Sequence, residues 1–103
     1  MNKEILFKAI EKYGIRPQED MFIEESAELI KAILKYRREE EKILKDISED
    51  YSTEMMLLLD DIVEEIADVE ITIAQLKIMF DCEKDVEEQK EYKLNRLKDR
   101  MEE

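Results

Sequence analysis

Apolar residues recur at helical spacing from about Met56 to Phe80, a stretch without Gly or Pro, which predicts one long helix. At about 100° per residue they form two stripes on nearly opposite sides, so we expect this helix to be covered on two faces. One stripe consists of Leu58, Ile62, Ile66, Val69, Ile73, Leu76 and Phe80, and the other of Met56, Val63, Ala67, Ile71, Ala74 and Ile78. A narrow strip between the stripes holds Asp61, Glu65, Asp68 and Thr72.

The same pattern predicts three further helices. A short helix covers residues 2–12 and ends at Gly14 and Pro17, and a second opens near Pro17 and continues through Arg38 or beyond. A last, peripheral helix covers residues 85–100 after a turn at Asp81-Cys82. Residues 46–53 predict a loop, with Ser52 or Thr53 capping the central helix. The expected core stripe of the second helix is Phe22, Ile23, Ala27, Ile30, Ile33 and Leu34.

Composition supports few, long helices. Of 103 residues, 45% are charged, and there is a single Gly and a single Pro, which leaves little turn chemistry. We therefore expect one all-α domain spanning residues 1–103, an antiparallel bundle of about four helices whose two long central helices carry the acidic residues. A chain this small with a two-sided central helix is expected to complete its burial as a homodimer or homotetramer.

The net charge limits the possible binding partners, and the single cysteine bears on the cellular compartment. The net charge of −12 works against binding a nucleic acid polymer or an anionic membrane surface, but a small anionic ligand remains open if a metal ion bridges it. No apolar run approaches the roughly 20 residues of a membrane span. Cys82 has no partner cysteine and there is no secretory signal pattern, so we expect a cytoplasmic protein.

Two pairs of carboxylates at i, i+3 spacing border apolar surface without a strong local counter-charge. Glu65 and Asp68 have no Lys or Arg three or four residues away, Glu25 has none either, and Glu28 has only Lys31. If the two central helices pack together, these four carboxylates can converge, which either raises their pKa values or requires a divalent cation. Oxygen ligands in a chain without His favour a hard metal, Mg²⁺ or Mn²⁺. The alternative is an ordinary solvated acidic face.

These residues resemble a known family. The order of two short motifs is similar to the EExxE and ExxD pair of the MazG-like nucleoside triphosphate pyrophosphohydrolases, in the all-α superfamily that also holds the dimeric dUTPases. The motifs here are Glu24-Glu25-Ser26-Ala27-Glu28-Leu29 and Glu65-Ile66-Ala67-Asp68-Val69, with further similarity at Tyr13-Gly14, Gln18 and Lys93-Leu94-Asn95-Arg96. The 36 residues between Glu28 and Glu65 form a longer spacer than in compact members.

The resemblance implies Mg²⁺-dependent hydrolysis of a nucleoside triphosphate to the monophosphate and pyrophosphate, in nucleotide-pool housecleaning. It places the metal on Glu25, Glu28, Glu65 and Asp68. Glu24 is a candidate to orient the attacking water, with salt bridging to nearby Lys as the alternative.

Candidate substrate contacts lie at both ends of the chain. Lys93, Arg96 and Arg100 form a basic ridge at i, i+3, i+7 that is suited to phosphate, although a solvated face balanced by neighbouring Glu residues explains it equally well. Asn95 and Gln18 are weaker candidates for contacts to base or ribose.

Two other functions remain open at this stage. One is a non-enzymatic helical oligomerisation module whose acidic strip docks onto a basic partner. The other is a degenerate family member that binds nucleotide without cleaving it.

Overall fold

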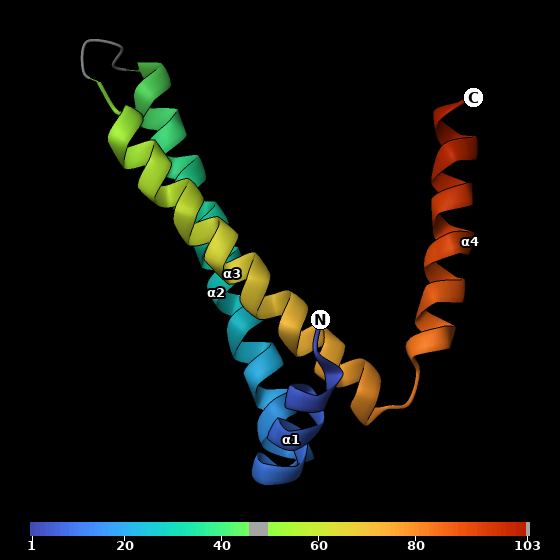
Figure 1. Cartoon of the computed structure of the whole chain (residues 1–103). Coiled ribbons are helices and arrows are strands. Elements are labelled where there is room, and N and C mark those ends of the chain that lie inside the picture. Colours follow the sequence, from blue (N-terminus) through green and yellow to red (C-terminus); the bar gives the residue numbers. More distant parts are fainter. Residues whose placement is uncertain (46–49, 103) are drawn as a thin grey trace.

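A computed structural model describes residues 1–45 and 50–102, and within them the chain is all-helical with no strand (Figure 1). The helices are α1 (Lys3–Tyr13), α2 (Ile15–Lys45), α3 (Ser52–Met79) and α4 (Glu83–Met101). The predicted all-α class is confirmed. Pro17 lies in the first turn of α2, where a missing N–H breaks no intrahelical hydrogen bond, so this helix begins before the proline instead of at it.

Local residues determine where the helices begin and end, and one predicted cap differs from the structure. Gly14 ends α1 with a φ of 93°, a conformation that glycine adopts without a Cβ penalty. The prediction that Ser52 or Thr53 caps α3 is wrong, because both residues are helical and the side chain of Asp50 accepts the hydrogen bond from the Ser52 N–H at 3.0 Å. Residues 46–49 of the predicted loop lie outside the described residues.

The helices are arranged around one long pair. Figure 1 shows α2 and α3 side by side, with α1 packed where the start of α2 meets the end of α3. The turn predicted at Asp81-Cys82 is present, and Asp81 has a φ of 48°. After it α4 extends away from the pair (Figure 1). In the described part of the chain α4 packs on α3, and an ion pair at 2.8 Å joins Glu83 at the start of α4 to Lys3 of α1. The prediction of a peripheral last helix is therefore confirmed, since none of its residues is buried.

Very little apolar surface is buried within one chain. Of the large apolar side chains that the structure describes, only Leu6 and Leu58 are buried, and the radius of gyration is 18.3 Å against about 13 Å for a compact domain of this length. None of the described helices is long and apolar enough to cross a bilayer.

The expected core stripe of α2 is not the face that packs on α3. Ile23 and Ile30 are 65% and 60% exposed, and Ile33 and Leu34 are exposed as well, so the prediction that this stripe forms the core of the chain is wrong. The half-buried residues of α2 include Glu25, Leu29, Ala32 and Tyr36. On α3 the side that turns inward includes Glu65, Asp68 and Thr72 of the polar strip, with Thr72 only 5% exposed, whereas Asp61 of the same strip is exposed. The long helix pair therefore has a partly polar seam.

Candidate metal centre and adjoining cavity

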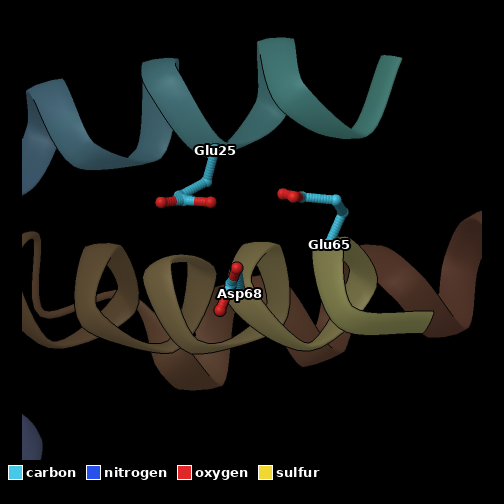
Figure 2. Close-up of side chains that lie close together, drawn as sticks. All are labelled: Glu25, Glu65 and Asp68. Carbon is cyan, nitrogen blue, oxygen red and sulfur yellow. The ribbon is translucent and has the colours of Figure 1, made fainter. Parts of the chain in front are cut away.

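Three carboxylates meet at the seam between α2 and α3. Glu25 comes from α2, and Glu65 and Asp68 come from successive turns of α3 (Figure 2). One carboxylate oxygen from each residue lies within 4.8 Å of the others, and all three residues are half-buried. The i, i+3 spacing of Glu65 and Asp68 places both on the side of α3 that faces Glu25.

Among the residues that the structure describes, no Lys or Arg neutralises this cluster. None of its members forms an ion pair with a Lys or Arg among residues 1–45 and 50–102. The Oε2 atom of Glu65 is buried and has no hydrogen-bond partner in the described structure. A buried carboxylate oxygen without a donor is costly, so this atom is suited to a ligand that the protein itself does not supply.

The electrostatics agree with that interpretation. Burial raises the pKa of Glu25, and the negative charges of Asp68 and Glu65 raise it further. Burial likewise raises the pKa of Glu65, with added repulsion from Asp68 and Glu28, partly offset by a hydrogen bond with Glu25. Such a bond between two carboxyl groups requires a proton on one of them. Without a cation, Glu25 and Glu65 therefore hold protons more tightly than an isolated Glu side chain does.

The donor set fits a hard divalent cation. It consists of carboxylate oxygens only, which suit Mg²⁺, Mn²⁺ or Ca²⁺ and not soft metals. Opposite oxygens around Mg²⁺ lie about 4.2 Å apart. Three ligand oxygens cannot all be opposite one another, and neighbouring oxygens around octahedral Mg²⁺ lie about 3 Å apart. The cluster oxygens, which lie within 4.8 Å of one another, would therefore have to move closer together to bind one Mg²⁺.

The structure does not bring the fourth predicted ligand into the cluster. Glu28 lies one turn further along α2, is exposed, and lines a shallow cavity of about 270 Å³ with Glu65 and Asp61. Its charge still raises the pKa of Glu65, so it is a near neighbour. Glu24, the predicted water-orienting residue, is also exposed, and its charge contributes to the raised pKa of Glu25.

An open cavity of about 480 Å³ adjoins the cluster and is lined by residues of α1, α2 and α3. Glu25 and Asp68 belong both to the cluster and to the cavity wall. The remaining wall is mainly apolar, with polar side chains at Gln18, Thr72 and Gln75. Gln18, a predicted substrate contact, is thus placed beside the candidate metal centre.

Sequence reasoning missed one of these polar residues and assigned no role to another. Gln75 follows Asp68 by seven residues and so lies two turns along the same side of α3, a spacing that could have identified it. Thr72 was recognised as part of the polar strip, and its hydroxyl donates a hydrogen bond to the Val69 carbonyl at 2.8 Å.

The predicted phosphate-binding residues lie elsewhere within one chain. Lys93, Asn95, Arg96 and Arg100 are all exposed on α4, which extends away from the helix pair in Figure 1. The described contacts of α4 are with α3 and, through the Glu83–Lys3 ion pair, with α1, and none is with α2. A single chain therefore does not bring these residues to the acidic cluster on α2 and α3.

No protein-family model, curated protein or solved structure matches this chain. The similarity to MazG-like enzymes stays a prediction.

Proposed function

We propose that this protein is an Mg²⁺-dependent nucleoside triphosphate pyrophosphohydrolase that cleaves (d)NTPs to (d)NMPs and pyrophosphate in nucleotide-pool housecleaning. The observation that carries the proposal is the meeting of three unneutralised carboxylates, one with an orphaned buried oxygen, at the wall of a ligand-sized cavity. The motif order that resembles MazG-like enzymes supports the same activity.

In this proposal Glu25, Glu65 and Asp68 hold the metal, and Glu28 joins them by a side-chain rotation from its exposed position nearby. Bound there, Mg²⁺ or Mn²⁺ would supply charge neutralisation for the triphosphate and a lowered pKa for the attacking water. The four carboxylates would hold the metal that the phosphates bind, and a carboxylate can also accept a hydrogen bond from the attacking water. Glu24, next to Glu25 on the solvent side, orients the water.

In this proposal the phosphate-contacting residues of the site come from another copy of the chain. The exposed apolar residues of α2 and α3 are too numerous for a stable single chain, and an antiparallel bundle completed by further copies, in a homodimer or homotetramer, would cover them. In such an assembly the basic ridge of Lys93, Arg96 and Arg100 can approach an acidic cluster and contact the phosphates, with Asn95 beside it.

The proposal is tested by incubating the full chain with each common dNTP and NTP plus Mg²⁺ and measuring pyrophosphate release. We expect release that requires the metal and that falls at least about a hundredfold in Glu65→Gln and Asp68→Asn, since each change removes charge stabilisation worth several kcal/mol. Glu70→Gln is the matched control, because Glu70 is an exposed carboxylate on the same helix outside the cluster, and it should keep full activity. Activity that survives both cluster substitutions would remove the proposal.

The alternative, an acidic oligomerisation module, is favoured by one observation only, the large exposed apolar area of the chain. It gives no reason for the orphaned oxygen of Glu65 or for the cavity beside it.

A further inference from the structure

The ion pairs of the described chain are unevenly divided between its helices. Most of them join two residues three or four positions apart on one helix. Among residues 1–45 and 50–102 only two ion pairs join different helices, and both hold the start of α4. Lys3 of α1 contacts Glu83 at 2.8 Å, and Lys77 in the last turn of α3 contacts Glu87 at 3.8 Å. We call these four residues the α4 clamp.

The clamp residues meet at one small junction. Lys3, Lys77 and Glu83 line the same cavity of about 220 Å³ between α1, α3 and α4. The hydrogen bond and the charge of Lys3 lower the pKa of Glu83, and the charge of Lys77 lowers it further. Glu87 also pairs with Lys90 on its own helix, at 3.3 Å. Both lysines of the clamp therefore act on the acidic first turns of α4.

Apolar packing adds little to this attachment. Val86 is half-buried, every other residue of α4 is exposed, and Figure 1 shows α4 apart from the other helices. Apart from the short turn at Asp81-Cys82, the direction of α4 thus depends mainly on charge. A single exposed ion pair is weak, so the direction of the helix needs several charges acting together and is sensitive to the loss of one.

The length of α4 amplifies any change at the clamp. At about 1.5 Å per residue, Arg100 lies about 25 Å along the helix from Glu83, so a tilt of about 10° moves it by about 4 Å. This displacement is much larger than the range of about 0.5 Å over which hydrogen-bond lengths vary. The clamp therefore controls where the far end of α4 can make a polar contact.

We propose that Lys3 and Lys77 are positioning residues for the proposed reaction, which clamp the acidic start of α4 and thereby fix the direction in which this helix presents its basic ridge. The inference rests on the proposed function, in which the ridge contacts phosphates at the acidic cluster of another copy. Neither lysine contacts the substrate, and each acts through α4.

The test measures the direction of α4 in the full chain. Spin labels are attached to Arg38→Cys on α2 and Gln89→Cys on α4, in a Cys82→Ser background, and their separation is measured by double electron–electron resonance. Both labelled positions are exposed. The labelled chains are diluted into an excess of unlabelled protein, so that only distances within one chain contribute.

We expect one narrow distance distribution for the intact clamp. In Lys3→Glu and in Glu83→Lys like charges face each other, so the distribution should shift or become at least about twofold broader. The double variant Lys3→Glu/Glu83→Lys exchanges the two charges and should restore the original distribution. Lys8→Glu is the matched control and should change nothing, because the ion pair of Lys8 with Glu4 lies within α1.

Lys77→Met tests the second arm of the clamp, since it keeps the length of a half-buried side chain and removes its charge. It should disturb the distribution as Lys3→Glu does. Unchanged distributions in both variants would overturn the inference. A disturbance in Lys3→Glu that the double exchange does not restore would overturn it as well.

Pyrophosphate release separates a positioning role from a merely structural one. In Lys3→Glu the kcat/KM for a nucleoside triphosphate with Mg²⁺ should fall about tenfold or more at an unchanged Tm, and the double exchange should restore it. A variant in which α4 moves while kcat/KM stays would overturn the positioning role and leave the proposed function intact. Failure of the proposed function gives a different result: wild-type protein then releases no pyrophosphate, although the distances still respond to the charge exchange.

Discussion

Glu25 on α2 and Asp68 on α3 face each other across the helix seam, and each contributes both to the acidic cluster and to the wall of the neighbouring cavity (Figure 2). This double membership joins a metal-binding end and a ligand-binding end into one site. A nucleotide has the matching shape, with charged phosphates at one end and a neutral base at the other. Because Glu25 and Asp68 belong to both, a metal ion bound at the cluster would lie beside a ligand bound in the cavity.

Metal binding should stabilise the fold. If the cluster takes up Mg²⁺, saturation at about a hundred times Kd adds about 2.7 kcal/mol to the free energy of unfolding, and the Tm rises accordingly. Asp68→Asn should lose most of this response, and Glu70→Gln should keep it. The measurement is a thermal melt with and without Mg²⁺. A module that only docks onto a basic protein would melt at the same temperature in both conditions.

The metal-free chain should become less stable as pH rises. Burial, reinforced by neighbouring charges, raises the pKa of Glu25 and Glu65 above the ordinary value of 4.5. A group whose pKa is raised by folding stabilises the folded state below the ordinary pKa, and this stabilisation is lost as pH rises through the raised pKa. Denaturation in EDTA from pH 4 to about 8 should therefore show the loss, and Glu65→Gln should reduce it.

The comparison between wild type and Glu65→Gln isolates this effect from groups of opposite sign. The pKa of Asp50 is lowered by its hydrogen bonds with Ser52, and that of Glu83 by the hydrogen bond and charge of Lys3, so their contributions are lost as pH falls. Both are present in the two proteins and cancel in the difference. If the free energy of unfolding depends on pH in the same way in both proteins, the raised pKa of Glu65 is contradicted.

The exposed apolar face of α2 should mediate self-association. Ile30 is 60% exposed in the single chain, so Ile30→Glu would be harmless if that face were solvated. We expect instead that sedimentation shows a homodimer or homotetramer for the wild type and a smaller species for Ile30→Glu, because burying an unpaired carboxylate at an interface costs several kcal/mol. Arg38→Ala, at another exposed position of α2, is the control and should leave the assembly unchanged. A wild-type monomer that is stably folded at low concentration would contradict this prediction.

The sequence predicted which segments form helices better than it predicted which helix faces pack together. Long helices follow directly from the spacing of Leu58, Ile62 and Ile66 and from the lack of Gly and Pro, because these are local properties. Which face of α2 packs on α3 is not local. The apolar stripe with Ile23 and Ile30 was the natural core prediction, but in one chain it faces outward.

For the candidate site too, local properties were predictable from the sequence and the packing of the helices was not. Glu25, Glu65 and Asp68 were identified because each lacks a local cation, and the structure brings these three together. Glu28, which has Lys31 as a possible local partner, was included because of its i, i+3 spacing from Glu25, yet it lies outside the cluster. Whether a residue one turn further along α2 reaches the cluster depends on how the two helices pack. Gln75 carries no charge, so the argument from missing counter-charges gave no signal for it.

The most direct measurement is a crystal structure of the protein grown with Mn²⁺ in place of Mg²⁺, using anomalous scattering to locate the ion. The account predicts a peak bounded by carboxylate oxygens of Glu25, Glu65 and Asp68, at about 2.1 to 2.2 Å from each. Glu65→Gln crystals prepared in the same way should lose the peak. An ion bound only elsewhere, or the three side chains separated in solvent in every copy of the assembly, would contradict it.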